Sequence, residues 1–307
     1  MKKTLLATTL LVATASFAAA EDNVTLSGSG RFGVVYSNDG VTSDTMIHTR
    51  LRINVDAKME TDSGITFGGR IRIQHTDGEL LGGAVAGAHA SRAMLYMETS
   101  GVRVEVGNAN GAYDSAGLMW NSEVGLKDTS YGDPNNTYIG YFSSGPDGAG
   151  SANAMGLFVS YSMGDFTARV SLHDADQSAG ANNDTETSVS VDWASNGFAV
   201  SAAYVTGEDP AATNDTTYIG AAYTIGDSTT VGLNYFTGDA PDLVTLYANH
   251  TLANGMTLAA YVADQDTYDT AFGLGASYPL GNGASLKAGY ESRGDVSRAS
   301  MGVTFGF

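Results

Sequence analysis

The 307-residue sequence contains no cysteine, only five prolines, and 15 basic residues against 33 acidic ones. The absence of cysteine excludes disulfide bonds, thiolate metal sites and cysteine nucleophiles. The shortage of Lys and Arg gives a formal charge of −18 at pH 7. This argues against a nucleic-acid partner, because binding to a phosphate backbone requires clustered basic residues that displace counterions. With 43% hydrophobic residues, the chain does not have the composition of a disordered acidic tail either.

The sequence also lacks an apolar run long enough for a transmembrane helix, which needs about 20 residues. Its longest apolar stretch lies within residues 1–20, after two lysines and before an Ala-Ala-Ala end. That order is typical of a secretory signal peptide, whereas an N-terminal anchor would need a longer run. We expect cleavage before Glu21 and a mature chain of residues 21–307 with a charge of 13 − 33 = −20. If the mature protein meets a membrane, it does so without helices.

Apolar and polar residues alternate with a period of two along the mature chain, which predicts strands. In residues 47–60, for example, apolar side chains alternate with mostly charged ones. The pattern is less regular in residues 154–162 and 243–252. The sixteen predicted strands cover residues 24–36, 47–59, 65–73, 93–97, 102–106, 154–162, 166–172, 189–193, 198–204, 219–225, 231–235, 243–252, 258–262, 272–278, 286–290 and 301–307.

Short turns alternate with longer polar loops between these strands. We place the long loops at roughly residues 38–45, 77–89, 108–153, 174–186, 206–216, 238–242, 265–269 and 293–297. The arrangement predicts an all-β fold, a 16-stranded antiparallel transmembrane β-barrel with short periplasmic turns and long outer loops. The spacing agrees, since soluble sandwiches show a turn about every 8–12 residues, and this chain is less dense in turns.

A soluble sandwich or lipocalin-like barrel is the alternative, because each of its strands also has one apolar face. The other face of these strands carries Arg, Lys, Glu, Thr, Ser and Gly, which cannot pack the interior of so wide a barrel. If these residues face water in a lumen, the apolar face must contact lipid.

Three features together resemble the Gram-negative general-diffusion porins, closest to the alphaproteobacterial sixteen-stranded group. They are the start VTLSGSGRFGVVY at Val24–Tyr36, the long segment after the fifth strand, and the ending MGVTFGF at Met301–Phe307. The resemblance implies a homotrimer in the outer membrane, reached by export through the periplasm and surrounded by lipid and lipopolysaccharide. It also implies that the third loop folds into the lumen and that the outer-membrane assembly machinery reads Phe307.

By this resemblance, the loop at about residues 108–153 is the constriction loop, and its length indicates that it is either functional or disordered. It carries acidic residues that we predict to line one side of the constriction: Asp114, Glu123, Asp128 and Asp133. A purely structural loop is the alternative interpretation.

Basic residues are concentrated on the first five and last two predicted strands, so closing the barrel brings eleven of the 13 mature ones onto one arc of wall. We predict that arginines at positions whose side chains alternate toward the lumen form the basic wall of the constriction: Arg31, Arg50, Arg52, Arg70, Arg72 and Arg92. Opposed to an acidic loop, they would produce a field across a narrow aqueous opening that favours small polar solutes. Ordinary solvation of the lumen is the alternative.

We therefore expect passive diffusion of small hydrophilic solutes and ions, with a sealed barrel acting as an adhesin as the rival. No cofactor or enzymatic reaction is expected, because the G-x-G-x-x-G match at Gly28–Gly33 lies inside a strand and no G-x-S-x-G elbow occurs. Asp174 and Asp176 resemble the start of a calcium loop, but its glycine falls one position late. They remain candidates for weak Ca²⁺ binding or for bridging lipopolysaccharide.

Overall fold

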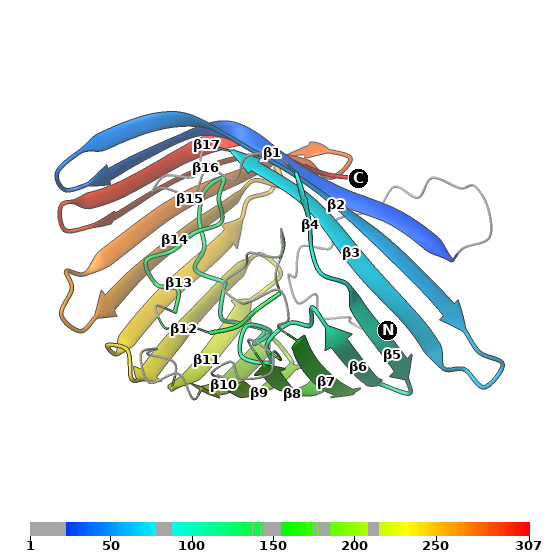
Figure 1. Cartoon of the computed structure of the whole chain (residues 1–307). Helices are drawn as coiled ribbons and strands as arrows, with labels where there is room; N and C mark the ends of the chain where they lie inside the picture. The colour runs from blue at the N-terminus through cyan, green and yellow to red at the C-terminus, as the bar shows by residue number, and fades with distance from the viewer. Residues whose placement is uncertain are drawn as a thin grey trace.

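Neighbouring strands pair antiparallel in chain order and the sheet closes on itself (Figure 1). The computed structural model describes residues 23–77, 88–134, 136, 138–141, 143, 155–174, 177, 185–207 and 215–307. The strands in these residues are β1 (Val24–Asp39), β2 (Ser43–Glu60), β3 (Thr66–Asp77), β4 (His89–Ala90), β5 (Met94–Thr99), β6 (Val102–Gly107), β7 (Met155–Met163), β8 (Phe166–Asp174), β9 (Thr185–Ser195), β10 (Phe198–Gly207), β11 (Thr216–Ile225), β12 (Thr229–Gly238), β13 (Leu243–Thr251), β14 (Thr257–Gln265), β15 (Ala271–Gly281), β16 (Ala284–Arg293) and β17 (Val296–Gly306).

Strands β4 and β5 are two pieces of one wall strand. Both pair with β3, β4 at Ile73 and Gln74 and β5 along Thr66–Arg70. At the interruption, the backbone N–H of Ser91 donates to the carbonyl of Arg72 (2.6 Å), and the Ser91 hydroxyl accepts from the Arg72 N–H (3.0 Å). The wall formed by the described residues therefore has sixteen strands, and the predicted fold class is confirmed.

The barrel closes between β1 and β17, whose register runs from Ser29 opposite Gly306 to Asp39 opposite Val296. Beyond it, the N–H of Phe307 donates to the carbonyl of Gly28 (3.0 Å), and the N–H of Gly28 donates to the carbonyl of Phe307 (2.7 Å). The Phe307 ring covers Gly28, since a Cβ there would lie 2.5 Å from the ring Cζ. The C-terminus lies beside β1 in Figure 1. Glycine is needed here because it leaves room for the ring.

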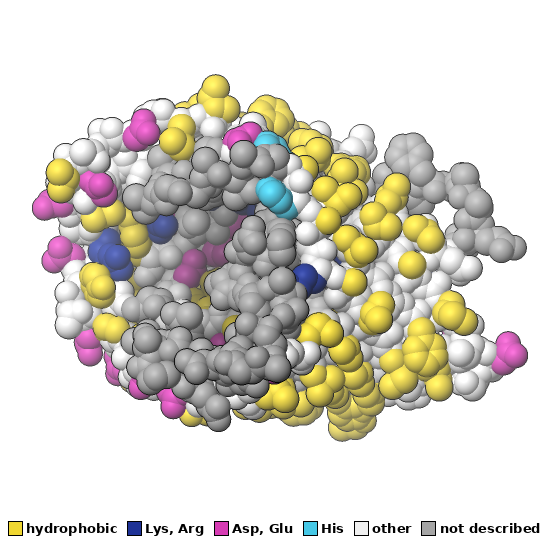
Figure 2. Space-filling view, viewed as in Figure 1, with side chains coloured by type: hydrophobic (Ala, Val, Ile, Leu, Met, Phe, Trp, Pro, Cys, Tyr) yellow, Lys and Arg dark blue, Asp and Glu magenta, His cyan; other side chains and the backbone are white. Residues whose placement is uncertain are grey.

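Large apolar side chains point outward at alternate positions around the wall. On β2, for example, Ile47 is 73% and Leu51 45% exposed, and on β11 Ile219 is 53% exposed. Figure 2 shows hydrophobic side chains gathered over the outer wall. A belt of this size is far larger than the apolar patches that soluble monomers expose. The outer face is therefore the face that contacts lipid.

Two outer connections are shorter than the sequence predicts. Residues 40–42 join β1 to β2, and residues 294–295 join β16 to β17. The first turn is tight because the Asp39 carboxylate accepts the N–H groups of Val41 (2.9 Å) and Thr42 (2.7 Å), and Gly40 adopts a positive φ of 87°. The predictions of long loops at 38–45 and 293–297 are therefore wrong, and the strands extend further on this side of the barrel.

The described residues include no helix long and apolar enough to cross a membrane. Residues 1–22 lie outside the described part of the chain, so the signal peptide stays a prediction.

Candidate functional site

The segment that follows β6 runs inside the barrel, as the green trace within the ring of strands in Figure 1 shows. Its backbone is held by hydroxyl groups of the wall. The N–H of Tyr113 donates to Ser188 of β9 (3.0 Å), that of Leu126 to Ser300 of β17 (2.9 Å), and that of Tyr131 to Tyr261 of β14 (2.8 Å). The third loop is thus folded into the lumen and attached to the wall on the side of β9–β17.

An apolar core lies between this loop and the inner wall. On the loop side, Tyr113, Met119 and Val124 are almost fully buried. The wall contributes inward-facing apolar residues from β10 to β15: Ala203, Val205, Tyr218, Ala222, Phe236, Leu243, Tyr247, Tyr261, Ala263 and Ala271. The expectation that the inward face meets water is therefore wrong for this half of the barrel, because the loop covers it and gains the free energy of apolar burial.

The tip of the loop, Val124–Leu126, rests on four glycines of the wall, which we call the glycine socket: Gly33 (β1), Gly302 (β17), Gly289 (β16) and Gly275 (β15). They form two register pairs, Gly33 with Gly302 and Gly275 with Gly289. A Cβ on Gly289 would lie 2.5 Å from the Cα of Gly125, and one on Gly302 would lie 2.8 Å from Cδ2 of Leu126. A side chain at Gly289 would meet the backbone of the tip and push it away from the wall.

Three carboxylates of the wall also hold the loop. Glu186 of β9 is 4% exposed and accepts the N–H of Ile139 with both oxygens (3.0 and 2.8 Å). Asp192 of β9 accepts the N–H of Gly117 (2.9 Å), and Glu291 of β16 accepts the hydroxyl of Thr129 (2.7 Å). The sequence analysis missed all three. Of the three, Asp192 alone lies within a predicted strand, whereas Glu186 falls in a predicted loop and Glu291 lies just beyond a predicted strand.

Among the described residues, Asp128 is the predicted acidic residue that forms an ion pair with a predicted arginine. Its carboxylate lies 2.5 Å from Nζ of Lys287 and 3.9 Å from Nη1 of Arg31. Arg31 also donates to the carbonyl of Lys127 (3.0 Å) and to Nε2 of His48 (2.8 Å). Asp128 therefore joins the loop tip to both β1 and β16.

The other three acidic residues form no ion pair with the six predicted arginines in the described structure. Asp133 accepts the N–H of Ser130 (2.9 Å), and burial raises its pKa to about 8. Burial also raises the pKa of Glu123 to about 9, with the charges of Asp133 and Asp128 adding to the effect. Burial raises the pKa of Asp114 as well. Glu123 and Asp133 are thus mostly protonated at neutral pH, because an unpaired buried carboxylate is costly.

The predicted basic residues lie together on β1–β3 and at the interruption that follows β4. Arg31 and Arg50 are register partners across β1 and β2, and Arg92 lies between β4 and β5. Arg70 donates to Asp56 (2.7 Å), so its charge is balanced within the wall. The structure therefore brings these arginines onto one arc, which lies away from the apolar core beneath the loop.

Arg52 and Arg72 contact the returning part of the loop. Both donate to the hydroxyl of Ser143, at 3.3 Å and 2.8 Å, and the Arg72 guanidinium lies 4.6 Å from the centre of the Tyr141 ring. Each side chain also donates to an amide oxygen of the wall, Arg52 to Gln74 (2.7 Å) and Arg72 to Asn54 (2.8 Å). These hydrogen-bond partners among the described residues are all neutral groups. The sequence offered no signal for Ser143 or Tyr141, because neither has a charge or a periodic position.

Two further predicted sites are not decided by the structure. Asp174 ends β8, whereas Asp176 lies outside the described residues. No group of three or more metal-binding side chains occurs in the part of the chain that is described. The calcium site therefore stays a prediction. Phe307 is 37% exposed at the closing seam, and its recognition by the assembly machinery stays a prediction too.

Comparison with known proteins agrees with this architecture. Residues 7–306 match the Gram-negative porin family. A porin of Fuscovulum blasticum is 36% identical over 293 residues, which cover 92% of this chain and 100% of that protein. A porin of Rhodobacter capsulatus is 27% identical over 318 residues, with coverage of 92% and 100%. A solved structure of a mutant Rh. blastica porin is 35% identical, with a TM-score of 0.85 over 92% of this chain and 100% of that one.

The lipid-facing wall, the infolded loop and the match over nearly the whole length lead to one conclusion. This chain belongs to the Gram-negative porin family and is an outer-membrane diffusion porin.

Proposed function

We propose that the narrowest part of the pore lies between the infolded loop and the arginines of β1–β3, and that small hydrophilic solutes and ions diffuse through it passively. The observation that carries the proposal is the position of the loop. It fills the side of the barrel lined by β9–β17, which leaves the arc with Arg50, Arg52 and Arg72 beside the remaining opening. The chain acts as a channel rather than as an enzyme.

The charges support a constriction that is locally positive. Asp128 is paired with Lys287 and Arg31, and the raised pKa values of Glu123 and Asp133 keep these groups mostly protonated at neutral pH. Among the described residues, the side chains of Arg52 and Arg72 donate hydrogen bonds to the neutral groups of Gln74, Asn54 and Ser143. A ring of charge at a constriction sets ion selectivity over a distance of about the Debye length, roughly 8 Å at physiological salt.

Liposome swelling with sugars of graded size tests the pore itself. A diffusion pore admits small sugars and shows a size cut-off, whereas a sealed adhesin-like barrel admits none. Nothing observed favours the adhesin, whose lumen would have to be closed by other means.

Reversal potentials in planar bilayers test the arginines. The double variant Arg52→Ala, Arg72→Ala removes two positive charges, so selectivity should shift toward cations. Lys58→Ala is the control, because Lys58 is an exposed basic residue near the end of the same strand. An unchanged reversal potential in the double variant would place these arginines outside the ion path.

We further propose that three chains assemble as a homotrimer within lipid and lipopolysaccharide, after recognition of Phe307 by the assembly machinery. The relatives support this proposal only through their membership of the same family. Mobility of an unheated sample on an SDS gel tests the trimer, since an assembled barrel migrates differently from a single chain.

A further inference from the structure

Arg52 of β2 and Arg72 of β3, which we call the arginine pair, reach the same oxygen atom of the loop. The Ser143 hydroxyl accepts Nη2 of Arg52 (3.3 Å) and Nη1 of Arg72 (2.8 Å). Two guanidiniums that share one acceptor lie close together, and like charges at short distance repel each other. The fold therefore holds two cations side by side where the loop returns to the wall.

The strands on which the arginine pair lies give it neutral partners. Across β2 and β3, Arg52 faces Gln74 and Asn54 faces Arg72. Each arginine donates through Nε to the amide oxygen opposite, at 2.7 Å for Gln74 and 2.8 Å for Asn54. An amide fixes the direction of a guanidinium but leaves its charge in place.

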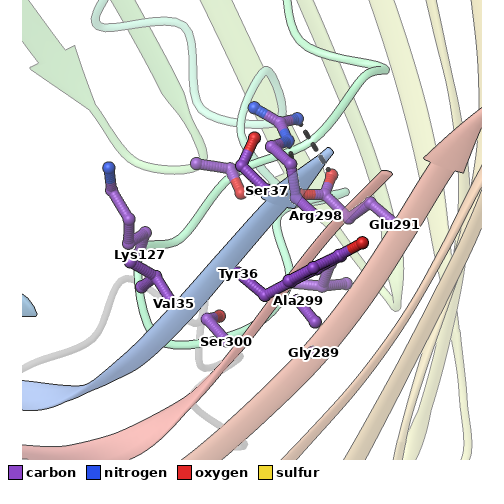
Figure 3. A pocket seen from close by; sticks show the side chains of 11 residues that line it. Val35, Tyr36, Ser37, Lys127, Gly289, Glu291, Arg298, Ala299 and Ser300 are labelled. Atoms are coloured by element: carbon purple, nitrogen blue, oxygen red, sulfur yellow. Dashed lines mark hydrogen bonds and ion pairs between the residues drawn. The ribbon is translucent and has the colours of Figure 1, made fainter. Parts of the chain in front are cut away.

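Other arginines of the inner wall have a carboxylate partner instead. Two positions beyond Asn54 on β2, Asp56 faces Arg70 and accepts its Nε (2.7 Å). Arg298 of β17 pairs with Glu291, with Nε 3.2 Å from Oε1, and Figure 3 marks this contact with dashed lines. In the described part of the chain, no carboxylate forms an ion pair with either member of the arginine pair.

Donor groups remain available at the arginine pair. A guanidinium has five N–H donors, and hydrogen bonds to described residues use two of them in each arginine. The Ser143 hydroxyl accepts two hydrogen bonds there, which leaves its O–H free to donate. The Tyr141 ring, whose centre lies 4.6 Å from the Arg72 guanidinium, restricts the movement of that group. All three donor side chains are partly exposed, so a solute can reach them.

These donors suit a tetrahedral oxyanion that carries about two negative charges. A carboxylate has one charge and two oxygens in a plane, which match a single guanidinium. A phosphate group has a charge of about −1.5 to −2 at pH 7 and three acceptor oxygens. It can therefore balance both arginines and also accept the hydroxyl.

We propose that the arginine pair and Ser143 form a binding site for a phosphate group, carried by inorganic phosphate or by a small phosphate monoester. The inference rests on the proposed function, because the anion must reach the site through a water-filled lumen. The porin would then retain such anions briefly during passage, in addition to letting solutes diffuse.

Single-channel recording with phosphate added at constant chloride tests this proposal. Phosphate should interrupt the current briefly, more often as its concentration rises. Asn54→Asp keeps the shape of the side chain but places a carboxylate beside Arg72, as Asp56 does for Arg70. It should raise the half-blocking concentration about tenfold, as expected for loss of a charge-assisted interaction. Ser143→Ala removes one donor and should raise it severalfold.

Lys58→Gln is the matched control. It lowers the net charge by one unit, as Asn54→Asp does, and Lys58 lies on the same strand four positions away. Phosphate should block this variant as it blocks the native channel. Equal weakening of the block in the control and in Asn54→Asp would show that general charge, and not the arginine pair, attracts the anion.

The outcomes distinguish this inference from the proposed function. A normal current that phosphate does not interrupt overturns the binding site and leaves the pore standing. Equal block by acetate overturns the assignment to a phosphate group, because a single charge would then suffice. Block by glycerol phosphate as well as by phosphate supports a site that also admits monoesters, whereas block by phosphate alone supports a site for the free ion. Absence of any current overturns the proposed function and this inference together.

Discussion

The glycine socket gives the sharpest prediction, which is the effect of Gly289→Ala. The new Cβ would lie 2.5 Å from the Cα and 2.6 Å from the N of Gly125. Carbon atoms that are not bonded settle at about 3.5–4.0 Å, so the loop tip must move at least about 1 Å from the wall, into the lumen. Overpacking of this kind costs about 1–3 kcal/mol.

This displacement should be visible in the current but not in the barrel. The bond from Leu126 N–H to Ser300, now 2.9 Å, would lengthen beyond hydrogen-bonding distance, at a net cost of about 1 kcal/mol. We therefore expect a smaller single-channel conductance and greater open-channel noise in planar bilayers, with unchanged heat stability of the folded barrel on SDS gels.

Gly275→Ala is the matched control, because Gly275 is the register partner of Gly289. Its Cβ would lie 3.0 Å from Cβ and 3.1 Å from Cγ1 of Val124, contacts that a small side-chain movement relieves. The control should therefore differ little from the native channel. If Gly289→Ala also conducts with native amplitude and noise, the socket does not determine the position of the loop.

Three other changes test the loop and the seam. The pKa of Glu123 is about 9 in the folded chain against an ordinary 4.5, so attachment of the loop should be strongest below pH 4.5 and weaken as the pH rises toward 9. Limited proteolysis of the loop at a series of pH values measures this weakening, and Glu123→Gln should reduce it. An equal weakening in the variant would contradict the role of Glu123. Glu291→Gln removes the negative partner of Arg298 and should raise proteolysis of the loop severalfold, whereas unchanged cleavage would show that the ion pair is dispensable. Phe307→Ala uncovers Gly28 and should lower the melting temperature of the barrel, which circular dichroism measures; an unchanged value would mean that the ring does not stabilise the seam.

The wall could be predicted from the sequence because period-two alternation reports directly on what lies on each side of a strand. Ile47, Leu51 and Ile53 share one parity and lie on the outer face of β2, where the first two are well exposed. Closure could be predicted as well, since an antiparallel meander with both ends in the same wall has one natural partner for its last strand.

The inner side of β10–β15 was harder to predict, although one signal was present. In residues 243–252 the parity is irregular because both faces are apolar: Leu243 and Tyr247 are buried inward, while Val244 and Leu246 are exposed outward. Read alone, such a segment suggests only a poor strand. Its second apolar face is explained once the loop is known to cover it.

The socket and the arginine contacts could not be predicted, because they join residues far apart in the sequence. Gly33 and Gly302 become neighbours only when the barrel closes, and neither glycine differs locally from the many others in the chain. The same holds for Ser143, whose partners Arg52 and Arg72 lie about 70–90 positions earlier. Charge alone predicts that all four loop carboxylates line the constriction opposite the arginines; among the described residues, Asp128 is the one that forms an ion pair with a predicted arginine, and the place of the other three in the constriction stays a prediction.

The pairing of the first strand with the last has a consequence for biogenesis. Until residues 296–306 are in place against β1, the sheet has two open edges, each with a row of unsatisfied backbone groups that invites association with other chains. A nascent or truncated chain is therefore exposed to aggregation until its last strand is made. Both edges disappear together when β17 pairs with β1, so this one pairing removes the exposure of the whole sheet.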